Sequence, residues 1–380
     1  MFTGSQRDFL FVQSATEMGG AEVVLLNLFE CSPELRRRSL VANLAFGSGD
    51  LPRRLRAAGV EVVDLQNARI RDVVGVARTL ASLRRLIRSR GVRAVVGNGD
   101  HPQILGGLAA RLAGARSVFL DHMIYAWPWW KLPALEILAV KGPADLMLCV
   151  SKAARDALQR IRPGVQCQLL YDGTPEREVS AAEAGAAREE LGVRPGEVLF
   201  GVFGRLQRWK GQDVFVSAAI EVARARPGSR FVVVGGSVFG LEPEFFASLR
   251  QRVRERGLDD QITFTGFRTD VPRLMAACDV VCHTSRVPEP FGLVLIEAMM
   301  LGRPVIATRG GGPSEVIASE DLGVLVTPDD PAALAAEMIR LFDDRARREA
   351  IGAASAAHVR ANFGIERMAR ELIGQLDSLP

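Results

Sequence analysis

The sequence predicts an α/β protein built from two doubly wound parallel sheets that face each other across a cleft. Two series of short apolar segments alternate with helical patterns over comparable lengths, which is typical of two such sheets. Between the series, residues 173–196 are polar, rich in alanine and glutamate, and interrupted by proline and glycine, so we interpret them as a linker. A chain of 380 residues with 48% hydrophobic and 24% charged residues is long enough for two globular domains.

The first domain is expected to span residues 1–172. A buried strand at 9–13 is followed by a helix at 21–30, with Gly19 and Gly20 in the loop between them. These glycines would let the backbone approach a phosphate, or would simply form a turn. The later strands of this domain share the same short apolar pattern and are expected at 40–45, 60–65, 94–97, 117–120, 146–150 and 168–171.

Polar and aromatic residues follow two of these strands. His101 and His122 each come just after a strand, where open parallel sheets place their ligands, although a histidine can also be purely structural. Trp127, Trp129 and Trp130 lie together in one loop. Such a loop suits sugar stacking or a membrane interface, or packing against the next helix.

Charge is distributed unevenly along the chain. Residues 1–175 hold 23 Lys and Arg against 15 Asp and Glu, a net of +8, whereas residues 176–380 hold 25 against 29, a net of −4. A predicted helix at 72–90 carries several arginines off its apolar stripe, as a membrane-facing helix or one packed on a sheet would. The basic half indicates an anionic partner such as a membrane surface, or reflects arginine-rich composition alone.

The second domain is expected at 197–355, followed by a C-terminal helix over 356–380 that packs back on the first domain. Its strands again read as short apolar runs, at 198–203, 231–234, 262–265, 279–282, 304–307 and 323–326. Helical patterns alternate with them at 212–226, 243–256, 271–276, 292–301, 331–342 and 345–362.

Two glutamates eight residues apart carry the strongest chemical signal. Glu289 lies in a loop between two prolines, and Gly292 then opens a short apolar helix whose single acid is Glu297. A carboxylate in such a run should be buried and should need hydrogen-bond donors. The two acids flank a helix N-terminus that can receive a phosphate. Alternatively, Glu289 is an ordinary loop residue and Glu297 a core acid with a structural partner.

A second basic loop joins this constellation. Arg205 and Lys210 stand between a buried strand and a helix start, in the sequence Gly-Arg-Leu-Gln-Arg-Trp-Lys-Gly that begins at Gly204. Beside free N–H groups, these two side chains would clamp a diphosphate, whereas as solvated loop charges they would do little.

Together the glutamate motif and the basic loop resemble the retaining glycosyltransferases of family 4, the group 1 glycosyltransferases of GT-B fold with two Rossmann-like domains. The resemblance covers essentially the whole chain. It implies that Glu289 contacts donor-sugar hydroxyls, that Glu297 contacts the nucleotide ribose, and that Arg205 and Lys210 bind the diphosphate. Backbone N–H groups of Phe291, Gly292 and Leu293, with Gly19 and Gly20, would complete the donor site.

The resemblance also assigns roles in the first domain. It places His122 by the reacting sugar carbon, with His101 as a companion toward the acceptor. One departure is His283, where small residues or proline are more familiar in the family, and this departure bears on base recognition.

The expected function is therefore transfer of a sugar from a UDP- or GDP-sugar to a saccharide or lipid-linked acceptor in bacterial-type glycan biosynthesis. The resemblance implies retention by a same-face route, with no metal cofactor. We expect no nucleic-acid partner. A sugar-nucleotide 2-epimerase of the same fold and a non-catalytic sugar-nucleotide-binding protein are the alternatives.

The compartment follows from what the sequence lacks. No apolar run reaches 18 residues, no signal peptide is evident, and the five cysteines form no C-x-x-C pair. We expect a cytoplasmic protein with reduced thiols that contacts the inner face of the cell membrane peripherally.

Overall fold

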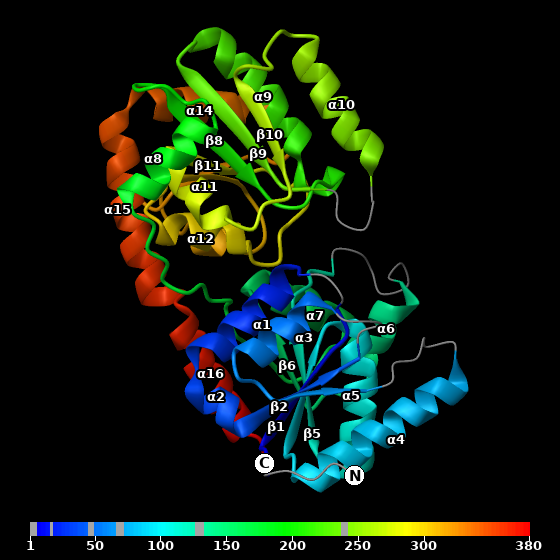
Figure 1. Ribbon diagram of the computed structural model, residues 1–380. Coiled ribbons are helices and arrows are strands. Elements are labelled where there is room, and N and C mark those ends of the chain that lie inside the picture. The colour runs from blue at the N-terminus through cyan, green and yellow to red at the C-terminus, as the bar shows by residue number, and fades with distance from the viewer. Residues whose placement is uncertain (1–5, 16–17, 45–48, 66–71, 126–132, 237–241) are drawn as a thin grey trace. The chain divides into compact units, whose positions relative to one another are not determined.

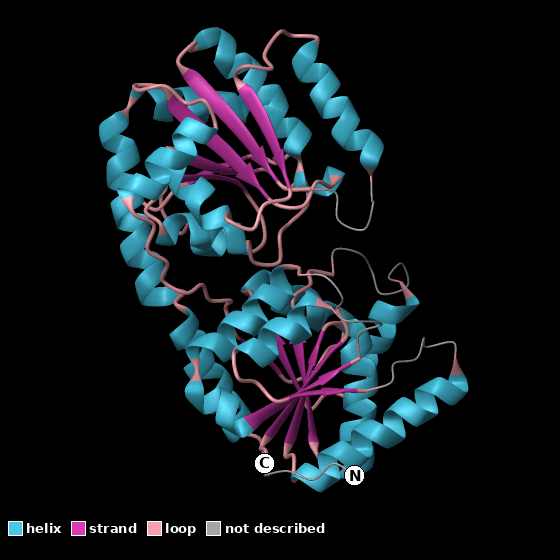
Figure 2. Ribbon diagram, in the orientation of Figure 1, coloured by secondary structure: helices cyan, strands magenta, loops and turns pink. Residues whose placement is uncertain are grey.

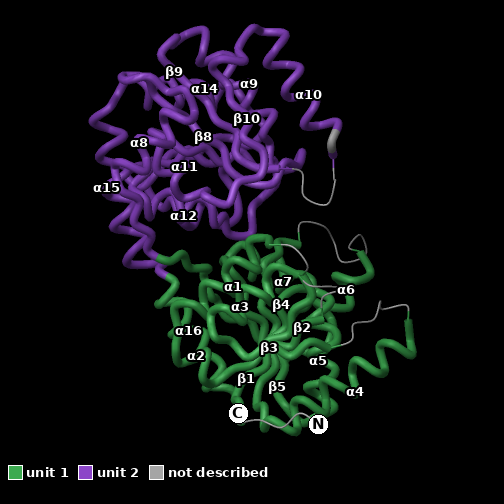
Figure 3. The backbone as a smooth tube through the Cα atoms, viewed as in Figure 1, with its two compact units in different colours: residues 1–175, 365–380 green, residues 176–364 purple. Residues whose placement is uncertain are grey.

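A computed structural model of the chain describes residues 6–15, 18–44, 49–65, 72–125, 133–236 and 242–380. The chain forms two compact units, one of residues 1–175 and 365–380 and the other of residues 176–364 (Figure 3). Each unit is a parallel β-sheet with helices on both faces (Figure 2).

The first unit contains a seven-stranded sheet in the order β3-β2-β1-β4-β5-β6-β7. Its strands are β1 (Phe9–Gln13), β2 (Ser39–Asn43), β3 (Val62–Asp64), β4 (Ala94–Asn98), β5 (Arg116–Asp121), β6 (Leu146–Cys149) and β7 (Cys167–Leu169). Its helices are α1 (Gly20–Cys31), α2 (Pro33–Arg38), α3 (Asp50–Ala57), α4 (Val73–Arg90), α5 (Asp100–Ala113), α6 (Ala134–Lys141), α7 (Lys152–Ile161) and α16 (Ile365–Asp377) (Figure 1).

The second unit contains a six-stranded sheet in the order β10-β9-β8-β11-β12-β13. Its strands are β8 (Val198–Phe203), β9 (Ser229–Val234), β10 (Ile262–Gly266), β11 (Val280–His283), β12 (Val305–Thr308) and β13 (Val324–Val326). Its helices are α8 (Ala181–Glu190), the 3₁₀ turn η2 (Arg208–Lys210), α9 (Gln212–Ala225), α10 (Pro243–Arg254), α11 (Val271–Ala277), α12 (Leu293–Met300), α13 (Pro313–Val316), α14 (Pro331–Asp343) and α15 (Arg345–Asn362).

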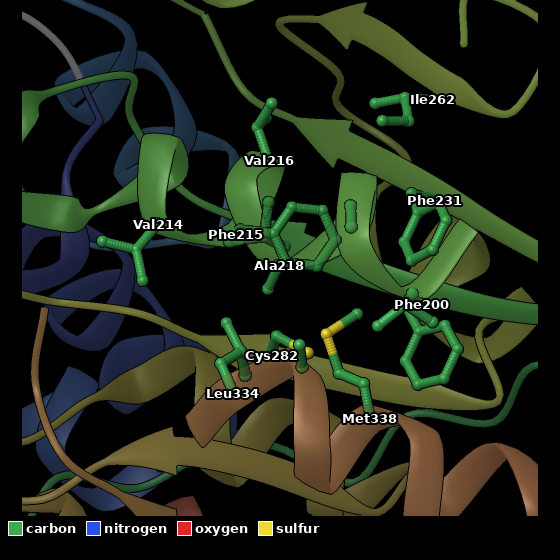
Figure 4. Close-up of a cluster of buried hydrophobic side chains, with 14 of the residues drawn as sticks. Phe200, Val214, Phe215, Val216, Ala218, Phe231, Ile262, Cys282, Leu334 and Met338 are labelled. Carbon is green, nitrogen blue, oxygen red and sulfur yellow. The ribbon is translucent and has the colours of Figure 1, made fainter. Parts of the chain in front are cut away.

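The central strands are mostly apolar because both faces of a parallel sheet are covered by helices, and the polar residues Gln13 and Asn98 stand at the ends of β1 and β4. Every residue of β1, β4 and β8 is buried. In the second unit the rings of Phe200 and Phe231 stack with centroids 5.7 Å apart, and Phe215 from α9 meets Phe231 edge-on (Figure 4). Met338 from α14 belongs to the same cluster of buried side chains. This packing fixes the strand ends that carry the site.

Two boundaries differ from the sequence prediction. Residues 173–196 are not a plain linker, because they include helix α8, which packs against α11 within the second unit. The predicted helix over 356–380 is in fact two helices: α15 ends at Asn362, and α16 begins at Ile365 and packs against α1. The alanine-rich composition of 173–196 signalled a helix, and the proline and glycine residues around it obscured that signal.

Candidate active site

The second unit carries its site at a topological switch point. Strands β8 and β11 are neighbours in the sheet although two strands separate them in the sequence. Parallel sheets bind ligands beyond the carboxyl ends of the strands at such a point. The loops that follow β8, β11 and β12 all leave from this edge, and they contain Arg205, Lys210 and Glu289.

Glycines hold these three loops close together. Gly211 has a φ of +68°, and a Cβ there would lie 2.0 Å from the carbonyl oxygen of Thr284. The Thr284 hydroxyl donates to the Lys210 carbonyl over 2.9 Å. Gly311 has a φ of +67°, and a Cβ there would lie 2.1 Å from the carbonyl oxygen of Glu289. No residue with a side chain fits either approach.

The Glu289 carboxylate is the centre of a dense polar network. Lys210 Nζ lies 2.8 Å from its Oε1 and 2.9 Å from its Oε2. The Ser285 hydroxyl donates to Oε2 over 2.7 Å, and His283 Nε2 lies 3.3 Å from the same oxygen. Only 9% of Glu289 is exposed. Burial alone would raise the pKa of Glu289, but the Lys210 ammonium and the His283 ring hold that pKa below its usual range, so the carboxylate stays ionised.

Arg205 differs from Lys210 in having a side chain without a hydrogen bond or ion pair to the described residues. Its backbone is held, since Gln212 Nε2 donates to the Arg205 carbonyl over 2.7 Å. The partly exposed guanidinium therefore stands at the strand edge with its donors available.

Helix α12 begins at this edge, with Gly292 as its N-cap at a φ of +97°. The first N–H groups of a helix have no intrahelical acceptor, so this end can receive an anion. Glu297 lies one turn further on and is only partly buried, and no donor from the described residues satisfies its carboxylate. Among the described residues, Glu297 therefore lacks the structural partner that the alternative interpretation as a core acid required. Burial raises the pKa of Glu297 to about 7, and Arg177 opposes that shift.

In the first unit, His122 follows β5 and Asp172 follows β7. Asp172 is 3% exposed, and its Oδ1 lies 3.7 Å from His122 Nδ1. Burial alone would lower the pKa of His122, but Asp172, with smaller contributions from Asp121 and Glu22, raises that pKa above its ordinary value. His122 Nε2 is buried and has no hydrogen-bond partner in the part of the chain that the structure describes. This nitrogen therefore has hydrogen-bonding capacity that the described residues do not use.

Asp121 adjoins His122 and is fully buried. Its Oδ1 accepts from the Met123 N–H over 3.1 Å and from the Tyr125 hydroxyl over 3.2 Å. Burial raises the pKa of Asp121 to about 7, and the charge of Asp100 adds to that shift. The carboxyl edge of this sheet is thus lined with acids around one histidine.

The other predicted site residues are placed as follows. Gly19 is the N-cap of α1, and its N–H already donates to Glu22 Oε2 over 2.9 Å, so this N–H is not free for a phosphate. Gly20 is exposed in the first turn of α1, and His101 lies in the first turn of α5. Trp127, Trp129 and Trp130 lie outside the described residues.

Several residues of these two edges were not predicted. Ser285, Thr308 and Asp172 contribute polar groups, and all three come at or just after the end of a strand. That position was the available signal, but small hydroxyl residues and a lone aspartate are too common there to be singled out by sequence alone. Trp209 was not singled out either, and Lys210 Nζ lies 4.1 Å from the centroid of its ring.

Among the described residues, no group of three or more His, Cys, Asp or Glu side chains could hold a metal ion. No helix in the same part of the chain combines the length and apolar character needed to cross a membrane.

Comparisons with known families match both units. The family described as glycosyl transferases group 1 matches residues 184–358, and the family described as glycosyltransferase family 4 matches residues 18–174.

Curated relatives agree with these matches. A GDP-mannose-dependent α-(1-6)-phosphatidylinositol monomannoside mannosyltransferase of Mycobacterium tuberculosis is 30% identical over 305 residues, which cover 76% of this chain and 77% of that protein. The lipopolysaccharide core mannosyltransferase LpsB of Rhizobium meliloti is 36% identical over 195 residues, 51% of this chain. That match spans about half of LpsB, 55% of its length.

Among solved structures, the Anabaena protein HepE in complex with UDP and glucose superposes with a TM-score of 0.87 and 28% identity, covering 98% of this chain and 100% of that one. Fold, motif and relatives lead to one conclusion. The chain belongs to the group 1 glycosyltransferases of family 4, with two Rossmann-like units as in GT-B enzymes.

Proposed function

We propose that the protein transfers a hexose from a UDP- or GDP-sugar to a saccharide or lipid-linked acceptor, with retention at the anomeric carbon. The observation that carries this proposal is the contact of the Lys210 ammonium with the ionised Glu289 at the switch point of the second unit, with Arg205 in the same loop as Lys210 and the N-terminus of α12 just after Glu289. The names of the relatives support the substrate class, since they include a GDP-mannose-dependent enzyme and a protein crystallised with UDP and glucose.

The chemical demand is the charge that develops on the departing diphosphate. Arg205 brings a guanidinium without a protein partner in the described chain, Lys210 an ammonium, and α12 the positive end of its dipole. Fixed positive groups at the leaving group stabilise the transition state without reorganisation. Glu289 would then accept hydroxyls of the donor sugar, and Glu297, which lacks protein donors among the described residues, would accept those of the ribose.

His122 has a separate role in this proposal. Its Nε2 would contact the reacting sugar, and Asp172 would orient the ring through Nδ1. In the same-face route that we propose, the departing phosphate oxygen takes the acceptor proton, so His122 stabilises the transition state and need not be a nucleophile. His122→Ala should therefore reduce turnover while nucleotide affinity stays near that of the wild type.

We further propose that the protein contacts an anionic membrane surface through helices α4, α5 and α6. The α4–α6 surface is defined by exposed apolar side chains, namely Val73, Val74, Leu108, Leu112, Leu135 and Leu138. Exposed arginines of α4 and α5, among them Arg85 and Arg111, lie on the same helices. Apolar and cationic side chains together suit the interface of an anionic bilayer.

A thermal-shift panel of nucleotide sugars tests the donor assignment. UDP-glucose, UDP-galactose, UDP-N-acetylglucosamine and GDP-mannose would be compared with UDP and GDP. A ligand at 100 times its Kd should raise the unfolding free energy by about 2.7 kcal/mol. Arg205→Ala should abolish most of that shift, whereas Arg224→Ala, which removes an exposed arginine of α9, should leave it intact. Absence of a shift with every nucleotide would refute the proposal.

Product analysis separates the remaining alternatives. The nucleotide sugar that stabilises the protein would be incubated with the protein and with extracts that contain acceptors. The reaction would be followed by proton and phosphorus NMR. Release of free nucleotide, together with a product whose anomeric configuration is the same as that of the donor sugar, supports the retaining transfer. Accumulation of an epimerised donor would identify an epimerase, and a donor that binds but never turns over would identify a binding protein.

A further inference from the structure

His283 is a buried member of the polar network around Glu289. It is the last residue of β11 and is 7% exposed. Its Nε2 lies 3.1 Å from Ser285 Oγ and 3.3 Å from Glu289 Oε2, and its Nδ1 lies 3.4 Å from Thr308 Oγ1. A buried imidazole with polar contacts on both nitrogens is held in a fixed orientation.

The hydrogen bonds around the ring determine which nitrogen carries hydrogen. The Ser285 hydroxyl has a single hydrogen and donates it to Glu289 over 2.7 Å. Ser285 Oγ can therefore only accept from His283, and the ionised Glu289 carboxylate can only accept as well. Both neighbours of Nε2 are acceptors, so we assign a hydrogen to Nε2. The ring thus donates toward the carboxylate from the side of strand β11.

Lys210 faces two demands in the proposed reaction. Its ammonium contacts both carboxylate oxygens of Glu289. The proposed function also assigns this ammonium to the diphosphate of the sugar nucleotide. When Lys210 turns toward a diphosphate, its hold on Glu289 weakens. A buried carboxylate that loses its donors either takes up a proton or moves to water. Some other donor must then keep Glu289 in place and ionised.

We propose that His283 is a positioning residue that holds Glu289 ionised and oriented toward the donor sugar while Lys210 engages the diphosphate. This inference rests on the proposed function and adds a residue to it. Ser285 extends the same hold, and Thr308 Oγ1, which donates its own hydrogen to the Ser285 carbonyl over 2.8 Å, contacts the ring at Nδ1. Every residue of β11, including Cys282 before His283, is buried.

A matched pair of variants distinguishes the effect of losing the hydrogen-bond donor at Nε2 from the effect of changing the size of the side chain. His283→Gln places an amide N–H₂ near the position of Nε2, whereas His283→Met has a similar size and no donor. The same pair at His358, which lies on α15 and takes no part in this network, serves as the control. Affinities for UDP and GDP would be measured by calorimetry beside those for UDP-glucose and GDP-mannose, and turnover would be measured with the sugar nucleotide that reacts.

With His283→Met we expect turnover to fall about tenfold or more, because one hydrogen bond to a charged group is lost in the transition state. Affinity for the free nucleotide should change by less than about twofold, since the diphosphate contacts remain. His283→Gln should recover most of the lost turnover, and the His358 pair should match the wild type. Equal losses of turnover in His283→Gln and His283→Met, or no loss of turnover in His283→Met, would overturn the proposal.

A direct measurement on the unmodified protein does not depend on how the variants fold. The chain has four histidines, so nitrogen–proton correlation spectra of the imidazoles can be assigned by single substitutions. We expect the Nε2 of His283 to carry hydrogen at neutral pH, with UDP present or absent. A deprotonated Nε2 would refute the inference even if the enzyme transfers sugar. Failure to bind any nucleotide would instead refute the proposed function.

Discussion

At the scale of single residues, the Lys210–Glu289 pair can be tested without knowing the substrate. Lys210→Ala removes two contacts from a carboxylate that is 9% exposed, so the unfolding free energy should fall by roughly 1–3 kcal/mol. Adding Glu289→Gln removes the unpaired charge, and the double variant should regain part of that loss. Urea unfolding of both variants measures the difference. A double variant less stable than the single one would show that Lys210 does not act through Glu289.

The second residue-scale prediction concerns Asp121 and pH. The pKa of Asp121 in the folded protein is about 7, above the ordinary value near 4. Between about pH 4 and pH 7, Asp121 is therefore protonated in the folded state and ionised in the unfolded state. The Asp121 contribution to stability therefore decreases as pH rises from about 4 to about 7, by up to about 1.4 kcal/mol per pH unit.

Asp121→Asn keeps an acceptor for Met123 and Tyr125 and removes the titration. The variant should gain stability relative to the wild type as pH rises through that window, as measured by urea unfolding at successive pH values. Glu297 has a raised pKa as well and remains in both proteins, so only the difference between the curves is diagnostic. The exposed Asp259→Asn is the control. Parallel curves for Asp121→Asn and the wild type would contradict the assignment.

At the scale of elements, the loops after β8 and β11 depend on Gly211. Its φ of +68° is matched by Gly257, whose φ is +64°, but a Cβ at Gly257 meets nothing within 4 Å. Gly257→Ala should therefore cost only the left-handed strain, roughly 1–2 kcal/mol. Gly211→Ala adds a collision with the Thr284 carbonyl, so it should cost more and should also weaken nucleotide binding. Thermal unfolding and calorimetry compare the two, and equal losses would mean that the close approach is unimportant.

The elements also show what a single sequence can and cannot predict. The apolar runs of β1, β8 and β11 identified the strands because strands buried on both faces carry few polar residues. The helix after Gly292 was found from its glycine and its apolar pattern. The ion pair of Lys210 with Glu289 was not predicted, since 79 residues separate the two and only the sheet order brings β8 beside β11. The partial exposure of Glu297 could not be predicted for a related reason, because exposure depends on what packs against α12.

At the scale of the whole molecule, the basic first half of the chain is partly accounted for by internal pairs. Arg38 bonds Asp8 and Asp377, Arg93 bonds Asp377, and Arg90 pairs with Glu61. Arg84 and Arg88 of α4 both donate to the Leu112 carbonyl at the end of α5, over 3.1 and 3.4 Å. These arginines therefore stabilise the fold whether or not a membrane is present, and the net charge alone overstates the cationic surface that a partner would meet.

A membrane therefore has to be tested on side chains that the fold does not use. Val73 and Val74 are 77% and 60% exposed at the start of α4, and Figure 1 shows this helix beside α5, whose neighbour is α6. Val73→Ser with Val74→Ser removes the two most exposed apolar side chains of the α4–α6 surface. Arg85→Ser with Arg111→Ser removes charges while Arg84 and Arg88 keep their contacts. Val287→Ser, exposed in the second unit, and Arg224→Ser are the matched controls.

Co-sedimentation with phosphatidylcholine vesicles, with and without phosphatidylglycerol, across a salt series gives the measurement. Each arginine near an anionic surface contributes about 1 kcal/mol, so each Arg→Ser change should weaken binding roughly fivefold at low salt. The effect of the arginines should fade as the Debye length shortens, whereas the effect of the valines should persist, because hydrophobic burial is not screened. Equal binding to both vesicle types, or binding to neither, would leave the charge asymmetry as composition and would favour an acceptor that is not held at a membrane.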